Sequence, residues 1–456
     1  MITITKFTPQ DLQKLRKKLF RLTVKHTLQN DSNIDINSLP EIINQKNNNV
    51  PGPETVKREL LPVIGLSPDN YDQELSTALD TALKLDEIEK PVVTVNESLC
   101  ENCDKKNEIS CVQSEEERGL MIEYNRCISC GKCIPRCPLR AISDKIEFVP
   151  MARYLKEDKP VYAHVAPAVV GQFGEEVTPG KLRSALKSIG FTDMIEVALF
   201  ADIITIHEAD EYINLVQDKD DFLITSCCCP VWLNLLNNHY PELSEKLTQI
   251  VSPMIASGRV IKAVFPEAIT VFIGPCIAKK SEAKEEGLKG AIDYVLTFEE
   301  LAEVFSAMEI NPAEMDENQK EQSSCGGRIY ARTGGVSQAV EVTLEELEIS
   351  ASVDFKPAQA DGIQECKKLL DKLQAGNLEA NFIEGMGCEG GCVGGPKRNI
   401  NPEKGKAAVE NFAYNSRAKN PLENKNVAYI LRQLDYLYHQ EKQWEELELK
   451  KLLLRE

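Results

Sequence analysis

Residues 223–232 read LITSCCCPVW, an apolar run that passes directly into three consecutive cysteines, a proline and a tryptophan. The run Leu223–Thr225 is typical of a short buried strand, and Pro230 is typical of the first turn of a helix. The cysteines Cys227–Cys229 are therefore expected in the turn between a strand and a helix.

Two further apolar runs lead to a cysteine in the same way. Ile269–Ile273 precedes Cys276, and Asn381–Ile383 precedes Cys388. In open α/β sheets, sites form outside the carboxyl ends of the strands. The sequence therefore predicts that cysteines from three distant segments meet in one crevice, which is the arrangement of an active site.

The rest of residues 160–399 has an α/β pattern. Val161–Val165 and Tyr294–Leu296 are predicted to be buried strands, with amphipathic helices between the strands. The clearest helix covers residues 179–189, because Thr178 can cap its start and Gly190 can end it. The expected fold class is α/β, with parallel sheets flanked by helices.

Composition excludes several classes of protein. The chain has 456 residues, of which 42% are hydrophobic and 27% charged, as in a soluble globular protein of several domains. A net charge of −18 disfavours nucleic-acid binding, since phosphates would be repelled. There is no membrane-length apolar run and no signal-peptide core at the start, so a cytoplasmic location is expected. Fifteen cysteines in an unexported chain indicate metal sites instead of disulfides.

Four cysteines in the second half of the chain can close around one iron–sulfur cube. Cysteine thiolates are the usual ligands of such cubes. Glycines between the last two of them allow the backbone to approach a bulky inorganic group. The four are Cys229, Cys276, Cys388 and Cys392.

A second cysteine cluster precedes the α/β region. Cys127, Cys130, Cys133 and Cys137 are spaced x2, x2 and x3 and are followed by Pro138. This is the bacterial ferredoxin pattern, whose clusters move single electrons. Several basic residues flank it and would attract an acidic ferredoxin-like electron carrier, or simply balance the charge of the clusters: Arg126, Lys132, Arg136 and Arg140.

Three more cysteines lie upstream, and two 4Fe-4S clusters are predicted. In two-cluster ferredoxins the last cysteine of the run binds the other cube, which would also take Cys100, Cys103 and Cys111. The remaining cube would then have a non-cysteine fourth ligand or a vacant iron, because Glu115 stands at the expected position. The alternatives are a single cube with three bystander thiols, or a zinc site at residues 100–111.

These features divide the chain into four segments. Residues 1–92 form a helical region, 93–150 a ferredoxin-like iron–sulfur domain, 151–400 the catalytic domain and 401–456 a C-terminal helical segment. The basic side of the first helix is interpreted as a solvated face in preference to a docking face.

The three cysteine segments resemble the active-site signatures of the iron-only (FeFe) hydrogenases over residues 160–400, and the ferredoxin run extends this resemblance upstream. The resemblance implies a two-lobed catalytic domain and an H-cluster. In that cofactor Cys229, Cys276 and Cys388 would hold a cube, and Cys392 would bridge it to a diiron unit with carbonyl, cyanide and dithiolate ligands.

The resemblance also assigns roles to residues around the diiron unit. Cys228 matches the thiol that relays protons, and the ordinary pKa of a thiol suits that work. Lys279 and Glu282 match a Cys-x-x-Lys-x-x-Glu signature, in which the lysine donates hydrogen bonds to a cyanide. Met386 matches a methionine packed on the diiron unit. Further matches are Ala166 and Pro167 in a wall of the pocket, and Ser226 and Pro275 inside the first two signatures.

Several positions depart from the family pattern. Gly274 stands where well-studied members carry methionine, and the third signature ends Gly394-Gly395-Pro396-Lys397. Two glutamates of the family's proton path appear replaced in the stretch 207–212. We therefore expect another proton route, through His207, Glu208 or Glu211. The extra cysteine of the first signature resembles the subgroup called group B.

The remaining cysteines are given structural roles. Cys325 and Cys366 match no signature and are predicted to be packing residues. Cys227 is interpreted either as a second relay thiol or as packing.

The sequence thus predicts a cytoplasmic hydrogenase of the type found in anaerobes. It would interconvert dihydrogen with protons and electrons, exchange electrons with a ferredoxin-like carrier, and receive its diiron unit from maturation proteins. Two rivals are weighed: an iron–sulfur assembly protein without a diiron centre, and a slow hydrogen sensor.

Overall fold

The computed structural model describes residues 9–29, 37, 53–68, 72, 74–96, 99, 112–115, 119–122, 127–157, 159–225, 228–347, 353–441 and 452–455. The chain divides into two compact units. The first comprises residues 1–159 with 299–311, and the second comprises residues 160–298 with 312–456. Among the described residues, no helix is both long and apolar enough to span a membrane.

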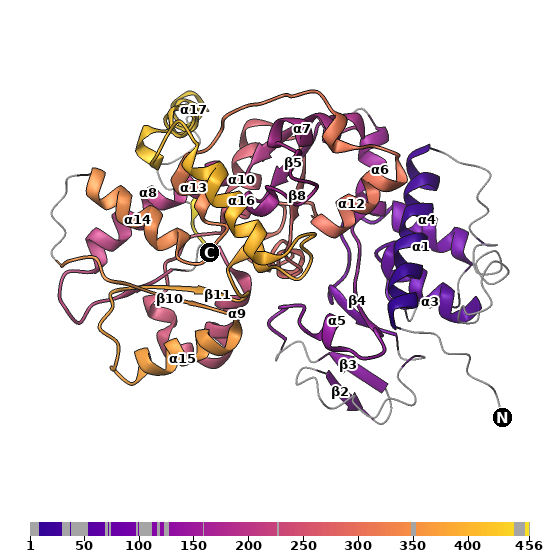
Figure 1. Cartoon of the computed structure of the whole chain (residues 1–456), viewed down its shortest axis with the longest axis horizontal. Coiled ribbons are helices and arrows are strands. Elements are labelled where there is room, and N and C mark those ends of the chain that lie inside the picture. Colours follow the sequence, from indigo (N-terminus) through magenta and orange to yellow (C-terminus); the bar gives the residue numbers. More distant parts are fainter. Residues whose placement is uncertain are drawn as a thin grey trace. The chain divides into compact units, whose positions relative to one another are not determined.

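A parallel sheet of four strands forms one layer of the second unit (Figure 1). The three neighbouring pairs are all parallel, so the carboxyl ends of the strands lie at one edge. The strand predicted at residues 161–165 has those bounds, and two other predicted strands are each one residue longer than expected. In sheet order the strands are β6 (Asp193–Glu196), β5 (Val161–Val165), β8 (Ile269–Gly274) and β9 (Tyr294–Thr297).

A second parallel sheet has the order β10 (Pro357–Asp361), β11 (Phe382–Met386) and β7 (Leu223–Ile224). Helices α9 (Pro230–His239) and α15 (Ile363–Gln374) pack on it, as Figure 1 shows. The packed core joins Trp232, Leu236, Leu370, Cys366 and Ile383.

The helix predicted after the first strand is confirmed. Helix α7 covers Pro179–Ser188, and the Thr178 side chain caps it by accepting a hydrogen bond from the Lys181 backbone N–H at 3.1 Å. Gly190 follows in a left-handed conformation with φ 107°, which a glycine adopts without strain.

Helix α8 (Ala198–Leu215) runs through the middle of the second unit and is buried over most of its length. It contacts α10 (Pro253–Val264), α13 (Cys325–Ile329) and α14 (Gly335–Glu346). A helix that is apolar on nearly every side is suited to such a position.

The buried carboxylate of Asp202 ties α8 to two later segments. It accepts hydrogen bonds from the Ser324 backbone N–H at 2.7 Å, the Gly327 N–H at 2.8 Å and Asn424 Nδ2 at 2.8 Å. Burial raises the pKa of Asp202 to about 6, although these hydrogen bonds oppose the shift. The carboxylate therefore holds the first turn of α13 against α8.

The first unit combines helices with two small antiparallel sheets. Strand β1 (Val93–Val95) pairs with β4 (Ile142–Asp144), and β2 (Val112–Glu115) pairs with β3 (Gly119–Ile122). The helices of this unit are α1 (Pro9–Gln29), α3 (Pro53–Val63), α4 (Leu75–Leu83), α5 (Cys133–Arg136), α6 (Phe148–Lys156) and most of α12 (Phe298–Ala307).

The basic side of α1 is not a simple solvated face. Lys17 Nζ lies 3.3 Å from Glu299 and 3.0 Å from Glu303, and Arg21 Nε lies 2.5 Å from Glu303. Lys25 pairs with Glu309 at 3.0 Å. The basic residues of α1 thus contact acidic residues that come from residues 299–311, a segment far along the chain.

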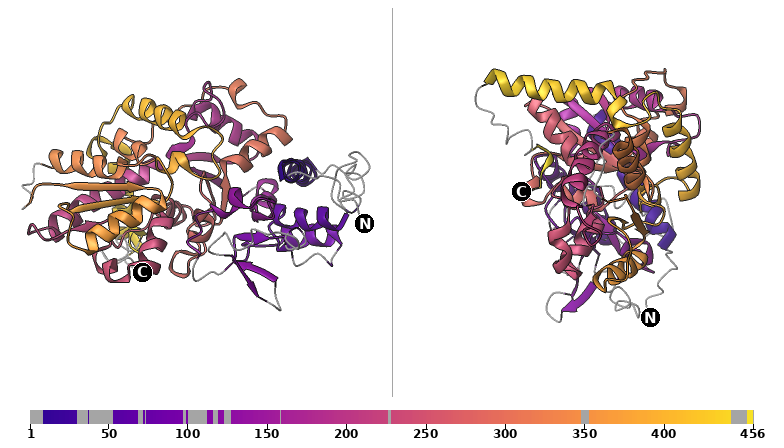
Figure 2. Two further views of the ribbon diagram at one scale, coloured as in Figure 1. Left: turned by 60° about the horizontal axis from the view of Figure 1, so that its bottom comes forward. Right: turned by 90° about the vertical axis from the view of Figure 1, so that its left-hand side faces the viewer.

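The end of the second unit contains helices α16 (Pro402–Tyr414) and α17 (Lys425–Glu441). Leu454, in the last described stretch, makes an antiparallel bridge with Ile250. These last described residues lie well away from α17 (Figure 2).

Candidate functional site

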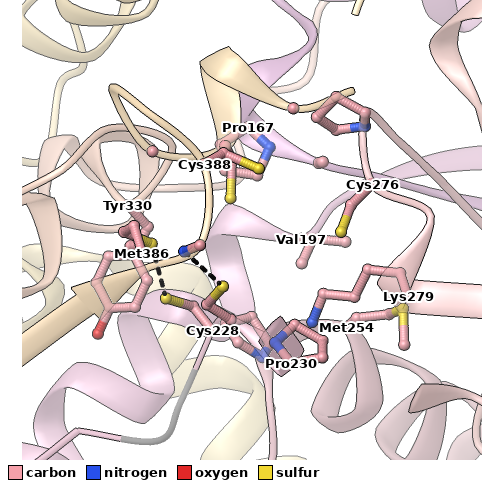
Figure 3. A pocket seen from close by; sticks show the side chains of 18 of the residues that line it. Pro167, Val197, Cys228, Pro230, Met254, Cys276, Lys279, Tyr330, Met386 and Cys388 are labelled. Atoms are coloured by element: carbon pink, nitrogen blue, oxygen red, sulfur yellow. Dashed lines mark hydrogen bonds between the residues drawn. The ribbon is translucent and has the colours of Figure 1, made fainter. Parts of the chain in front are cut away.

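The carboxyl ends of three strands surround a cavity. Five of the cysteines line it, together with Lys279, Met386, Ala166 and Pro167: they are Cys228, Cys229, Cys276, Cys388 and Cys392. In Figure 3 the sulfur atoms of Cys276 and Cys388 and the amino group of Lys279 point toward the same space.

Strand geometry explains why these cysteines meet. Strand β7 ends at Ile224, four residues before Cys228, and β11 ends at Met386, two residues before Cys388. Strand β8 ends at Gly274, two residues before Cys276. Within each sheet the strands are parallel and deliver their following loops to one edge. The crevice predicted from the sequence is therefore present.

Glycines in the third signature allow its backbone to pack tightly. At Gly391, which has φ 88°, an added Cβ would lie 2.6 Å from the Thr333 backbone nitrogen. At Gly395 it would lie 2.6 Å from the Pro275 carbonyl oxygen. A side chain at Gly395 would push residues 388–395 away from the segment that carries Cys276, and one at Gly391 would push them away from residues 332–333. Gly395 thus brings two cysteine segments together.

The electrostatics of the thiols show how close they are. Burial raises the pKa of Cys276 to about 11, with a further contribution from Cys229. Burial also raises the pKa of Cys392 to about 12, and both Cys229 and Cys276 add to the shift. Like charges disfavour one another at short range, so several adjacent thiolates need a cation to hold them. This donor set fits an iron–sulfur cube.

Cys228 faces the cavity and contacts the third signature. Its Sγ–H donates to Met386 Sδ at 3.7 Å, a contact drawn in Figure 3. The neighbouring Cys229 Sγ accepts a hydrogen bond from the Gly387 backbone N–H at 3.3 Å. The two adjacent thiols therefore have different surroundings, one beside a thioether and the other beside a backbone donor.

Lys279 supplies the cation nearest the thiols. Its Nζ lies 2.6 Å from Glu282 Oε2, and the side chains are 8% and 1% exposed. Burial lowers the pKa of Lys279, but the charge and hydrogen bond of Glu282 together with Cys276 and Cys228 outweigh it, so the net shift is upward. The ammonium form is thus retained beside the cavity.

A buried carboxylate fixes the strand that carries Met386. Glu384 on β11 accepts hydrogen bonds from the Gly334 backbone N–H at 2.8 Å and from Ser337 Oγ at 2.6 Å. These donors belong to the start of α14, where Gly334 has φ 75°. The Gly334–Val336 stretch therefore positions β11 and does not line the cavity.

The departure at Gly274 has a structural reason. A Cβ at this position would lie 2.6 Å from Phe272 Cε1 and 3.3 Å from Ala166 Cβ. Phe272 itself lines the cavity. An aromatic ring two residues earlier on the same face of β8 thus occupies the space beside this glycine.

We expect Gly274→Met to lower the free energy of unfolding by about 1–3 kcal/mol, because the new side chain overpacks against Phe272. In a Phe272→Ala background, which is itself less stable because a buried ring is lost, the same substitution should cost much less. Urea unfolding of the wild type, the two single variants and the double variant measures both effects. An equal loss from Gly274→Met in the two backgrounds would show that the ring is not what excludes the larger side chain.

Sequence reasoning missed some residues of the cavity wall. Tyr330 lines the cavity, and its hydroxyl lies 2.8 Å from Thr205 Oγ1 on α8. Phe272 and Val197 are also wall residues. The two-residue period of a strand could have indicated Phe272, because it places Phe272 on the same strand face as Gly274. Tyr330 carries no comparable sequence signal.

The residues proposed for the proton route lie on α8. Glu208 is fully buried and accepts a hydrogen bond from Thr225 Oγ1, three residues before Cys228. Burial raises the pKa of Glu211 to about 7, with Asp210 adding to the shift and the Gln249 backbone N–H opposing it. Glu208 and Glu211 are three positions apart and so lie on one side of the helix.

The ferredoxin run forms a compact loop in the first unit. The Ser129 backbone N–H donates to Cys127 Sγ at 3.4 Å, and the Ala141 N–H donates to Cys137 Sγ at 3.2 Å. Ser129 has φ 54°, an uncommon value for a non-glycine residue. Backbone donors aimed at cysteine sulfurs are suited to stabilising thiolates.

The other predicted site residues have varied placements. Cys100, Cys103, Cys111 and Ser226 lie outside the described residues, as does Cys227. Pro275 lines the cavity. Cys366 is fully buried and donates to the Met386 carbonyl at 3.3 Å, and Cys325 is 8% exposed in α13. Neither of these two lines the cavity, as expected for packing residues.

Comparisons with known proteins agree with this site. Residues 159–396 match the family model "Iron only hydrogenase large subunit, C-terminal domain", and residues 120–143 match a 4Fe-4S binding domain. The chain is 29% identical over 383 residues to iron hydrogenase 1 of Clostridium pasteurianum; the match covers 63% of this chain and 66% of that protein, just under two thirds of its length.

Two further similar proteins, a hydrogenase and an iron–sulfur assembly factor, differ in function from each other. A structure of the FeFe-hydrogenase HydA1 from Chlamydomonas reinhardtii shares the fold, with TM-score 0.54 and 23% identity over 65% of this chain and 93% of that one. The cytosolic Fe-S cluster assembly factor NAR1 of Yarrowia lipolytica is 22% identical over 52% of this chain and 63% of that protein.

Proposed function

The chain belongs to the iron-only hydrogenase family, and we propose that it is an FeFe-hydrogenase that interconverts dihydrogen with protons and electrons. The extra cysteine in its first signature aligns it with the group B subgroup. We place it in the cytoplasm of an anaerobic cell.

The observation that carries this proposal is the composition of one cavity. Four cysteines suited to a cube share it with a fifth thiol, a buried lysine and a methionine. Cys229, Cys276 and Cys388 would hold the cube, and Cys392 would join it to a diiron unit with carbonyl, cyanide and dithiolate ligands. When bound, that group supplies the metal at which dihydrogen is made or split.

The protein's own residues would move the proton and orient the cofactor. Cys228 holds a proton at Sγ and turns it toward Met386 Sδ at the cavity wall. Lys279 Nζ offers charged donors to an anionic ligand while Glu282 holds it in place. Met386, Ala166, Pro167 and Phe272 give the cavity an apolar lining that excludes water.

Electrons would enter through the first unit. Cys127, Cys130 and Cys133 are partly exposed and would hold one 4Fe-4S cluster near the surface. A second accessory cluster would take Cys100, Cys103 and Cys111 together with Cys137. Arg136 is exposed beside the run and would attract an acidic ferredoxin-like carrier. Maturation proteins would provide the diiron unit.

A second candidate function is supported by the likeness to an iron–sulfur assembly factor. Such a protein would use the cubes without a diiron unit. Lys279, Glu282, Met386 and Cys228 surround space that this function does not require, which favours the hydrogenase. A slow hydrogen sensor would share the whole cavity and differ only in turnover and output.

Two measurements separate these functions. Infrared bands of iron-bound carbonyl and cyanide are expected from protein matured with its diiron unit. Their absence, with the iron–sulfur clusters present, would leave the assembly factor as the better explanation. Rapid hydrogen evolution with a reduced ferredoxin would then distinguish an enzyme from a sensor.

The proton route is assigned to α8 and is tested by replacing its carboxylates and histidine one at a time. We expect Glu208→Gln to lower hydrogen evolution about 100-fold, because it removes a transferable proton beside Thr225. Since the pKa of Glu211 is raised to about 7, its carboxyl is protonated below that pH and charged above it. Glu211→Gln should therefore remove an inflection of the rate near pH 7.

Asp220→Asn is the matched control for this series, because Asp220 is an exposed carboxylate beyond the end of α8. Unchanged hydrogen evolution in His207→Gln, Glu208→Gln and Glu211→Gln alike would exclude a route along α8.

A further inference from the structure

Residues 452–455 lie along residues 249–251 and pair with them through backbone hydrogen bonds. The Val251 backbone N–H donates to the Leu453 carbonyl at 2.8 Å, and the Arg455 N–H donates to the Gln249 carbonyl at 2.7 Å. Ile250 and Leu454 form the antiparallel bridge between these two bonds. The backbone of this segment is thereby held in a defined register.

A side chain from α10 secures the same segment. Arg259 Nη1 donates to the Leu454 carbonyl at 2.8 Å, and Arg259 Nη2 donates to the Gly287 carbonyl at 2.9 Å. The guanidinium therefore links residues 452–455 to the chain that follows α11 (Ala278–Glu282). Together, the two backbone hydrogen bonds and the two hydrogen bonds from Arg259 place Arg455 beside α11.

The Arg455 side chain reaches two glutamates there. Its Nη1 lies 2.7 Å from Glu285 Oε2, and its Nη2 lies 3.4 Å from Glu282 Oε1. Arg455 is 22% exposed, whereas Glu282 is 1% exposed. The shorter ion pair, Arg455–Glu285, is at the edge of the protein, and the longer one, Arg455–Glu282, leads into its interior.

Glu282 is consequently shared between two cations. Its Oε1 faces Arg455, and its Oε2 accepts from Lys279 Nζ at 2.6 Å. A buried carboxylate is stable only when its oxygens are paired and hydrogen-bonded. With Oε1 held from outside, only Oε2 is directed at Lys279, and the other ammonium protons remain available to the cavity.

We propose that Arg455 is a positioning residue for Lys279: it orients Glu282 from outside the cavity, and Glu282 in turn sets where the Lys279 ammonium points. Without Arg455, Glu282 would turn both oxygens to its single remaining cation and draw the ammonium away from the cavity. The inference rests on the proposed function, because it is the cyanide of the diiron unit that would report the change.

The variants are chosen to leave the backbone pairing intact. Arg455→Gln removes the charge but keeps the N–H that binds Gln249, and Arg455→Lys restores a charge at the same place. Arg417→Gln is the matched control, since Arg417 is 91% exposed and pairs with Glu321 at 3.1 Å elsewhere in the unit. All are made in the full chain with its iron–sulfur clusters.

The first readout is the infrared spectrum of matured protein. Arg455→Gln should shift the stretching band of the cyanide near Lys279 relative to the wild type, Arg455→Lys should reverse the shift, and Arg417→Gln should cause none. The inference would be overturned if the wild type shows cyanide bands and Arg455→Gln leaves their positions unchanged. The proposed function would remain intact in that case.

The second readout does not need the diiron unit. In urea unfolding followed by tryptophan fluorescence, Arg455→Gln should lower the folding equilibrium constant roughly tenfold, and the same change should have a clearly smaller effect in a Glu282→Gln background, where only the ion pair with Glu285 is lost. If the wild type shows no cyanide bands, the proposed function fails and this cycle decides alone. Equal losses in the two backgrounds would then refute the coupling, and unequal losses would support it.

Discussion

Hydrogen evolution by Cys392→Ala should be undetectable, and its infrared spectrum should contain no carbonyl or cyanide bands. Cys392 is the cysteine proposed to belong to both the cube and the diiron unit, so no other thiol can replace it by a small movement. It is partly exposed at the cavity wall, which it shares with Cys229, Cys276 and Gly391. The measurements are gas chromatography of dihydrogen and infrared spectroscopy after maturation.

The ferredoxin run provides an internal control for this variant. Cys127–Cys137 lie in the other compact unit, so their cluster should give an unchanged electron paramagnetic resonance signal when Cys392 is replaced. Cys325 is a buried thiol that lies in the same unit as Cys392 but outside the cavity. The Cys325→Ala variant should therefore retain full activity. Carbonyl and cyanide bands of normal intensity in Cys392→Ala would contradict the bridging role.

Replacing Cys228 by alanine should slow hydrogen evolution at least about 100-fold while leaving the cofactor bands in place. The thiol is the only titratable cavity group that contacts Met386 within the described residues, and loss of a positioned proton donor typically costs that factor. Activity and infrared spectra measured on one preparation separate proton transfer from cofactor assembly.

A Cys228→Ser variant serves as the matched control, because a hydroxyl keeps the size and hydrogen bonding of the group but has a much higher pKa than a thiol. Cys228→Ser should assemble the cofactor, and its hydrogen evolution should remain slow. Full turnover in Cys228→Ala with an assembled cofactor would remove Cys228 from the proton route.

Much of the second unit could be predicted from the sequence. The apolar run 161–165 became β5, and 269–273 became all but the last residue of β8, because parallel strands buried on both faces have continuous apolar sequences. Leu223–Thr225 was predicted as a strand, but β7 ends at Ile224. Pairing in the sheet, which the local sequence does not encode, decides where such a short strand ends.

The cavity cysteines could be predicted because their residue type and their position after strands carry the information. Tyr330 could not, since an aromatic residue in a loop is ordinarily a packing residue. Arg455 could not either, because its partners lie 170 and 173 positions earlier in the chain. Contacts of this range are set by the tertiary fold and leave no periodic pattern.

The assignment of residues 299–311 to the first unit affects any attempt to take this protein apart. The polypeptide passes from one unit to the other and back, so no single cut yields both halves complete. A fragment that starts at Pro160 would keep Glu299, Glu303 and Glu309 but lose Lys17, Arg21 and Lys25. Swapping the amino-terminal module between relatives therefore requires transplanting this internal helix with it.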